Sequence, residues 1–82
     1  MELNKAFSLR VKEILKEKKI TQYKLAQQTN MYQSTMTDIL SCKYKTSNFK
    51  NMALIIRELG LSMQEFFNSD LFEFSNLEIE EN

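Results

Sequence analysis

The chain of 82 residues is long enough for one domain with one modest hydrophobic core, and 43% of its residues are hydrophobic. One Gly and no Pro are too few for the tight turns of a sandwich or barrel, so the composition favours an all-helical bundle. The formal net charge is zero. The single Cys excludes an internal disulfide and a cysteine-based zinc site. The lack of His removes the commonest metal ligand and the commonest general base.

The N-terminal half begins with two predicted helices. Residues 3–18 form the first, because apolar side chains recur at steps of three and four: Leu3, Phe7, Val11, Ile14 and Leu15. Thr21 is a suitable N-cap for the second, over residues 22–29. Its inward side is expected to be Leu25, Ala26 and Thr29. Asn30 comes next and tolerates the left-handed conformation that ends a helix.

Three further helices are predicted before residue 67. The third begins at Gln33, and its inward residues are Met36, Ile39 and Leu40. Residues 41–48 are polar and partly basic, which predicts a loop. The fourth helix, ended by Gly60, is marked by Phe49, Met52, Ala53, Ile55, Ile56 and Leu59. Ser62 caps a short fifth helix that carries Met63, Phe66 and Phe67. Residues 1–67 are therefore expected to be one compact all-α domain.

Residues 68–82 form an acidic and apolar tail of a different kind. Residues 1–67 hold all 11 Lys and Arg against six Asp and Glu and carry a charge of +5, whereas the tail carries −5. A basic body suits a polyanionic partner, with the tail pointing away from it; the alternative is a solvated surface with a solubilising tail. Partial alternation over residues 71–74 and 77–80 predicts extended or β structure, packed on the body or paired across a dimer; the alternative is a frayed tail.

Residues 21–40 are the most informative stretch for function. Two short helices joined by a turn over residues 30–32 have the helix-turn-helix arrangement. The small side chain of Ala26 allows those helices to cross closely, with Met36 and Ile39 filling the angle between them. The outward-facing residues of the third helix are Gln33, Ser34, Thr37 and Asp38. Their short or planar hydrogen-bonding groups are typical of side chains that contact base edges.

The sequence resembles the Cro and repressor family of lambdoid phages and bacteria, the Cro/C1-type or lambda repressor-like helix-turn-helix proteins. The resemblance covers about residues 7–67 and is carried by Thr21–Asn30, by Gln33–Met36 with Ile39, and by Phe49–Ser62. It implies a five-helix DNA-binding domain and double-stranded DNA as the partner. Gln22 would hold a phosphate and brace the recognition helix, and Gln33 would bond adenine or another base.

The resemblance, together with the position and chemistry of the side chains, suggests the remaining contacts. The base-reading residues would be Gln33, Ser34, Thr37 and Asp38, with Asp38 accepting from a cytosine amino group. The DNA backbone would be contacted by Gln22, Tyr32, Lys43, Lys45, Thr46 and Asn48, with less support for Arg10 and Lys12 on the first helix. The plainer interpretation is that the glutamines and Ser34 only begin helices and that the two loop lysines are ordinary surface charges.

Five positions depart from the family's pattern. Asn30 and Cys42 stand where relatives often have Gly, so Cys42 either adopts left-handed geometry or belongs to a different turn. Tyr32 occupies a helix cap where Ser or Thr would serve better. Leu15 and Leu40 replace an ion pair of several relatives and are expected to form an apolar contact.

The sequence thus predicts a bacterial or phage transcription regulator, most simply a repressor, that binds a pseudo-palindromic operator as a homodimer. The dimer surface is expected to be Met63, Phe66, Phe67, Leu71, Phe72 and Phe74, with Leu77 and Ile79. The alternative is a protein-interaction module or antitoxin with little specific DNA binding. Enzymatic activity, a cofactor and a small-molecule ligand are not expected. No secretion signal or membrane-spanning run is visible, so a cytoplasmic location is expected.

Overall fold

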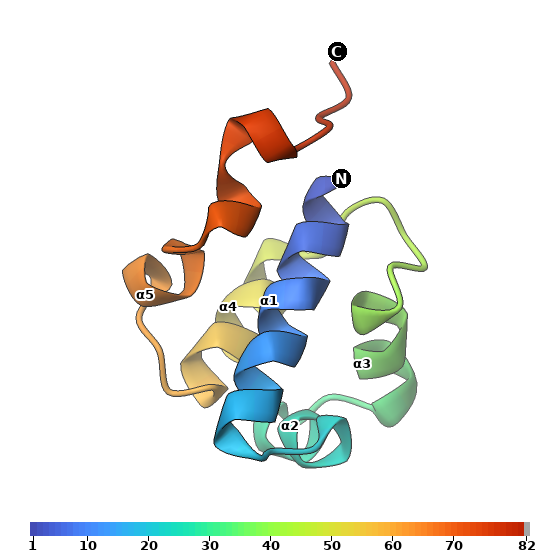
Figure 1. The fold of residues 1–82 in the computed structure, drawn as a ribbon. Helices are drawn as coiled ribbons and strands as arrows, with labels where there is room; N and C mark the ends of the chain where they lie inside the picture. Colours follow the sequence, from blue (N-terminus) through green and yellow to red (C-terminus); the bar gives the residue numbers. More distant parts are fainter. Residues whose placement is uncertain (82) are drawn as a thin grey trace.

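The computed structural model describes residues 1–81 and confirms the predicted all-α fold (Figure 1). Five helices follow one another in the chain: α1 (Leu3–Lys18), α2 (Gln22–Thr29), α3 (Gln33–Leu40), α4 (Phe49–Glu58) and α5 (Met63–Phe67). Two short 3₁₀ helices come after them: η1 (Asp70–Phe72) and η2 (Phe74–Asn76). No helix within the described residues is long and apolar enough to cross a membrane.

Side-chain caps determine where α2 and α5 begin. The Thr21 hydroxyl accepts a hydrogen bond from the Lys24 amide at 3.0 Å. At the start of α5, Ser62 Oγ accepts from the Glu65 amide at 3.1 Å, and the Glu65 carboxylate accepts from the Ser62 amide at 3.0 Å. This reciprocal pair is a capping box. Backbone donors that a helix start leaves unpaired are satisfied in both places.

Four residues with positive φ turn the chain at or shortly after helix ends: Lys19 (φ 56°), Asn30 (φ 58°), Cys42 (φ 60°) and Gly60 (φ 81°). Left-handed geometry at Asn30 and Gly60 confirms the predicted helix ends. Cys42 adopts left-handed geometry, which was one of the two alternatives predicted for it. Lys19 was not anticipated, because nothing in a lysine side chain favours the left-handed region. Its amide donates to carbonyls of the last turn of α1, and this closes the helix.

The helices enclose one hydrophobic core in which large apolar side chains are almost fully buried. Its members are Phe7, Val11, Ile14, Leu15, Leu25, Ala26, Met36, Leu40, Ile55, Ile56, Leu59 and Phe66. Leu15 and Leu40 both belong to this cluster, as their apolar character predicted. Ser8 is one of three buried polar residues, with Asn4 and Thr29, and its hydroxyl donates to the Leu40 carbonyl at 2.5 Å, which joins α1 to α3. The core therefore fixes α3 against α1.

The first part of the tail is packed on the body but does not have the predicted extended structure. Residues 70–76 turn through η1 and η2, and the one β-bridge of the described residues joins Glu2 to Glu78. The ring of Phe72 packs 4.8 Å from Phe67 and 5.9 Å from Phe66, centroid to centroid. A two-stranded hairpin is marginal by itself, whereas an aromatic ring packed on the body buries apolar surface at once. The extended prediction for residues 71–74 was wrong for this reason.

Candidate nucleic-acid interface

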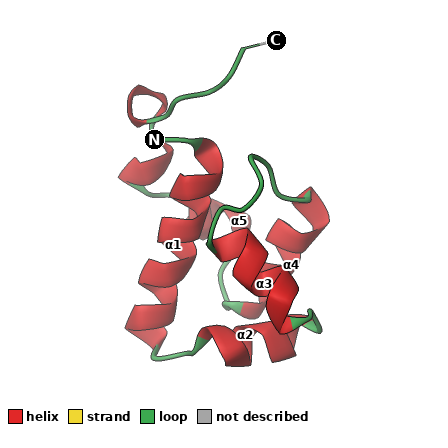
Figure 2. Cartoon of the chain, turned by 90° about the vertical axis from the view of Figure 1, so that its right-hand side faces the viewer, coloured by secondary structure: helices red, strands yellow, loops and turns green. Residues whose placement is uncertain are grey.

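Helix α3 lies at the surface, with α2 below it and the loop of residues 41–48 above it in Figure 2. Its inner side carries Met36 and Leu40, which are buried in the core and set the rotation of the helix. Its outer side carries Gln33, Ser34, Thr37 and Asp38, of which Asp38 is half-buried. The helix therefore presents a row of hydrogen-bonding groups to solvent.

Two side-chain amides join α2 to α3. Gln22 Nε2 donates to Thr37 Oγ1 at 3.2 Å, and Gln33 Nε2 donates to the Tyr23 carbonyl at 3.1 Å. Gln22 lies in the first turn of α2, so it connects the start of that helix to the outer face of α3. All these groups are near the surface, where such bonds exchange readily with water or with another partner.

The loop of residues 41–48 is held in place by α1. Asn4 is buried and its side-chain nitrogen donates to the Tyr44 carbonyl, while Cys42 Sγ lies 3.6 Å from the Asn4 carbonyl oxygen. The left-handed geometry of Cys42 turns the chain away from α3 at this point. These contacts give the loop a defined position beside α3.

A hollow of about 240 Å³ lies between α3, this loop and the start of α4. Its lining residues are Thr35, Asp38, Ile39, Tyr44, Thr46, Ser47, Asn48 and Asn51. Asn48 Oδ1 accepts from the Asn51 amide at 3.2 Å and caps α4. The cap leaves the Asn48 side-chain nitrogen able to donate to an acceptor in the hollow.

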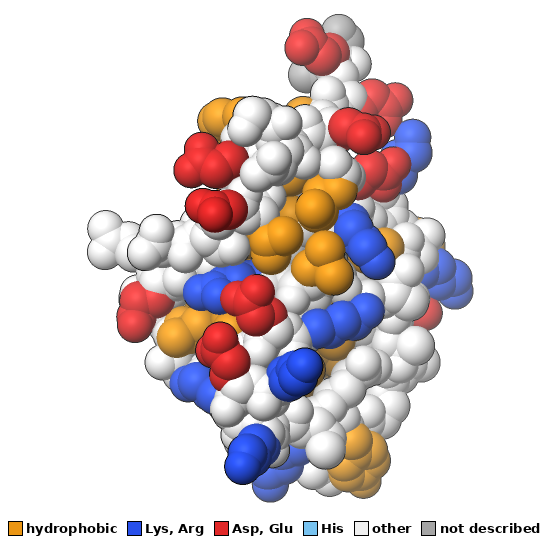
Figure 3. Space-filling model, viewed as in Figure 1, with side chains coloured by type: hydrophobic (Ala, Val, Ile, Leu, Met, Phe, Trp, Pro, Cys, Tyr) orange, Lys and Arg blue, Asp and Glu red, His pale blue; other side chains and the backbone are white. Residues whose placement is uncertain are grey.

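Each lysine of the loop lies near a carboxylate. Lys43 Nζ is 3.9 Å from Asp38 Oδ2, and Lys45 Nζ is 3.1 Å from Glu80 Oε2. Figure 3 shows the wider pattern, with many carboxylates gathered towards the C-terminal end and, over the rest of this face, Lys and Arg side chains with some carboxylates among them. Exposed ion pairs contribute about 0–1 kcal/mol, so either lysine can exchange its carboxylate for a phosphate at little cost.

A family model of the Cro/C1-type helix-turn-helix DNA-binding domain matches residues 10–74, from within α1 to the start of η2. The chain belongs to the Cro/C1-type helix-turn-helix family. No curated protein and no solved structure matches it. Membership supports binding to double-stranded DNA and a role as a DNA-binding regulator in general, in a family that is typically non-enzymatic.

In this Cro/C1-type protein, most of the predicted contact residues surround α3. Those on α3, on the first turn of α2 or in the adjoining loop are Gln22, Gln33, Ser34, Thr37, Asp38, Lys43, Lys45, Thr46 and Asn48. Tyr32 precedes α3, makes no side-chain cap and is exposed, which leaves its phenol free to approach a phosphate. The bond from Gln22 to Thr37 is the brace that the family resemblance implied.

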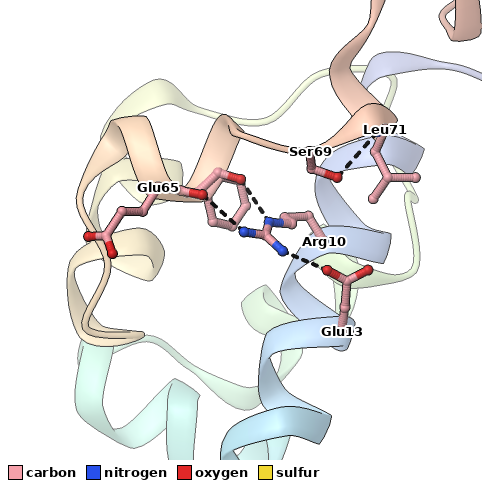
Figure 4. A network of polar contacts seen from close by, with 6 residues as sticks. Arg10, Glu13, Glu65, Ser69 and Leu71 are labelled. Atoms are coloured by element: carbon pink, nitrogen blue, oxygen red, sulfur yellow. Dashed lines mark hydrogen bonds and ion pairs between the residues drawn. The ribbon is translucent and has the colours of Figure 1, made fainter.

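Arg10 does not belong to this set (Figure 4). Its guanidinium donates to the Phe66 carbonyl at 2.7 Å, to the Glu65 carbonyl at 3.0 Å and to the Glu13 carboxylate at 2.6 Å. It also lies over the Phe66 ring, and the side chain is only 15% exposed. In Figure 1, α5 and α3 lie on opposite sides of α1. The prediction of a DNA contact at Arg10 was wrong, because this side chain joins α1 to α5.

Phe66 was also wrongly placed in the dimer surface. Its ring is 0% exposed and packs 5.2 Å from Phe7 and 4.9 Å from Phe67, centroid to centroid. A short helix carries few core positions, and the sequence pattern does not distinguish its inner aromatic residue from the outer one. Among the other predicted members, Met63, Phe67 and Phe74 are exposed, while Leu71 and Phe72 are half-buried.

Sequence reasoning missed Asn4, Tyr44 and Asn51. A signal for Asn4 was present, because it lies three and four residues before Phe7 and Ser8 and so shares the inner face of α1. The exposed ring of Tyr44 stands between the two loop lysines, which is a usual composition for a surface that contacts nucleic acid. Asn51 had no distinguishing signal.

Proposed function

We propose that this protein is a sequence-specific transcription regulator that represses by binding a pseudo-palindromic operator as a homodimer in the cytoplasm. The observation that carries the proposal is the exposed row of polar side chains on α3, braced from α2 and flanked by a loop with two lysines. Helices of this kind enter the major groove, and flanking basic residues contact phosphates.

The contacts divide by chemistry. Gln33 can bond the N6 and N7 atoms of adenine once it exchanges its bond to the Tyr23 carbonyl for the base. Ser34, Thr37 and Asp38 follow along the same face and meet neighbouring base edges. Gln22, Tyr32 and residues 43–48 are left for the sugar–phosphate backbone, which positions the helix and carries no sequence information directly.

A homodimer follows from the small number of base pairs that one α3 can contact. Two half-sites lie about 34 Å apart on one face of DNA, so the dimer contact must leave both recognition helices on one side. An apolar hollow of about 510 Å³ adjoins the loop of residues 41–48; Phe49, Met52, Phe67, Phe72 and Ile79 are among its lining residues. Phe74, whose ring is exposed, lies in the tail between two of these lining residues, Phe72 and Ile79. A second copy seated here would cover this apolar surface beside the recognition helix.

Selection from a random duplex pool at about 0.1 M salt tests the proposal. The wild-type protein should enrich a two-fold symmetric site, and Gln33→Ala should relax the preference at one position of each half-site. Gln64→Ala is the matched control, because Gln64 is exposed on α5, away from α3. Failure to enrich any sequence would contradict specific regulation.

One observation favours a second function. Both loop lysines lie near carboxylates of the same chain, which lowers the positive field offered to DNA. A protein-interaction module or antitoxin with little specific DNA binding is therefore the alternative. Salt-sensitive binding to every duplex, with no enriched site, is the result that would favour it.

A further inference from the structure

The last turns of the tail are fixed to the start of the chain. The Met1 amine donates to the Asn76 carbonyl at 2.8 Å, and the Glu78 amide donates to the Met1 carbonyl at 2.7 Å. The same amine is 3.8 Å from the Glu78 carboxylate, and Glu2 forms a parallel bridge with Glu78. These contacts set the direction in which residues 79–81 leave the body.

That direction brings the tail alongside the loop of residues 41–48. Glu80 Oε2 lies 3.1 Å from Lys45 Nζ, and the two side chains are 77% and 75% exposed. Residues 78–80 and residues 45–47 line the same apolar hollow. The tail therefore does not point away from the basic surface, as its charge had suggested. The Glu80 carboxylate instead pairs with Lys45, a lysine that was predicted to contact the DNA backbone.

We propose that residues 78–80, the C-terminal clasp, compete with DNA phosphates for Lys45 and lower the affinity of this protein for DNA. The inference rests on the proposed DNA-binding function. A phosphate that binds Lys45 must compete with Glu80 for the ammonium, and the Glu80 carboxylate then remains near the incoming charge. Charges closer than the screening length, about 10 Å at 0.1 M salt, still repel one another. The clasp thus opposes binding both by occupying the lysine and by repelling the backbone.

The size of the effect follows from the exposure of the pair. Ion pairs between exposed side chains contribute little, so the clasp reduces affinity by a modest factor and does not block binding. Glu80→Gln should tighten binding to a duplex of unrelated sequence by about 1.5- to 5-fold at low salt, and the gain should shrink as salt rises. The slope of log affinity against log salt concentration should become steeper, by up to the amount that about one phosphate contact contributes. The reason is that Lys45 can then neutralise a phosphate without first giving up a carboxylate partner.

The decisive experiment is a double-mutant cycle on the full chain. Binding of a fluorescent duplex is measured for the wild type, Glu80→Gln, Lys45→Gln and the double variant, with Glu73→Gln as a control of equal charge change in the same exposed tail. The clasp predicts that Glu80→Gln tightens binding more than Glu73→Gln does, and that this excess disappears in the Lys45→Gln background.

Two results overturn the inference. If Glu73→Gln matches Glu80→Gln, or if the gain survives without Lys45, the tail acts by net charge alone and the clasp is refuted while DNA binding stands. If neither the wild type nor Glu80→Gln binds any duplex, the proposed function fails and the clasp fails with it. Thermal unfolding of each variant by circular dichroism confirms that the exposed substitutions leave the fold intact.

Discussion

At the scale of single residues, Asp38 is the most informative side chain of the candidate interface. It lies on α3, half-buried, with Lys43 Nζ 3.9 Å from its carboxylate. A carboxylate that faces DNA is repelled by phosphates but can accept a hydrogen bond from the amino group of cytosine. The nearby ammonium reduces that repulsion, and the hollow beside the helix leaves space for a base edge to approach.

Asp38→Ala should therefore remove a preference for cytosine at one position of each half-site. The expected loss of discrimination is about 1–3 kcal/mol, and affinity for other bases at that position should stay the same or rise. Competition binding with operator variants measures both quantities. An unchanged base preference at every position would show that Asp38 makes no base contact.

Glu65 links a local motif to the pH dependence of stability. Hydrogen bonds from the backbone and then the side chain of Ser62 lower the pKa of the Glu65 carboxyl. A carboxylate with a lowered pKa stabilises the folded state above its unfolded-state value, and that stabilisation is lost as pH falls through the folded-state value. The capping box is therefore strongest at neutral pH and weakens in acid.

Glu65→Gln should lower the free energy of unfolding at neutral pH and have progressively less effect as pH falls towards about 3. The amide of Gln still accepts from the Ser62 backbone, so only the charge-dependent part of the cap is removed. Urea unfolding at a series of pH values gives the difference between the two proteins. A difference that is constant over the whole range would contradict the role of the charge.

At the scale of elements, the end of α1 carries strain that the ends of α2 and α4 avoid by residue choice. Asn30 and Gly60 suit positive φ, whereas Lys19 adopts φ 56° with an unsuitable side chain. The left-handed region costs an ordinary residue about 1–2 kcal/mol, and the chain accepts this cost because the Lys19 amide must close the helix there.

Lys19→Gly is thus expected to raise the free energy of unfolding by about 0.5–1 kcal/mol, the relief of strain less the extra entropy of Gly in the unfolded chain. Lys16→Gly is the matched control, since Lys16 is exposed and helical in the same turn, and it should destabilise by about 1 kcal/mol. Chemical denaturation compares the three proteins. Equal destabilisation by both substitutions would contradict the strain argument.

At the scale of the whole molecule, two phenylalanines have different expected roles, one in folding and the other in assembly of a dimer. Phe66 is fully buried between α1 and the tail, whereas Phe74 is 80% exposed in the tail, between Phe72 and Ile79, which line the apolar hollow. A buried ring stabilises the monomer, and an exposed ring of this size next to an apolar surface is available to a second copy. The proposed dimer surface would therefore be centred on Phe74, Phe67 and Ile79.

Phe74→Ala should weaken dimerisation without lowering the stability of the monomer, while Phe66→Ala should cost about 3–5 kcal/mol of folding free energy. Sedimentation over a range of protein concentrations measures the first effect, and urea unfolding at low concentration measures the second. Unchanged association of the Phe74→Ala protein would remove this surface from the dimer.

Local interactions explain what the sequence determined by itself. Helix boundaries depend on residues a few positions apart, such as Thr21 with Lys24 or Ser62 with Glu65, so caps and periodicity located all five helices. The helix-turn-helix segment and most side chains around α3 followed from the same local rules. To predict which side chains of α3 face outward, it was enough to identify its buried, apolar face.

Contacts between distant residues were decided by the tertiary structure alone. Arg10 meets α5 across 55 and 56 residues, Lys45 meets Glu80 across 35, and Phe66 meets the first helix rather than solvent. Such partners depend on how the helices pack, and an exposed arginine, lysine or aromatic residue looks the same in sequence whether it meets DNA, a second copy or its own chain. Packing geometry makes that choice, because it alone sets which surfaces lie within reach of one another.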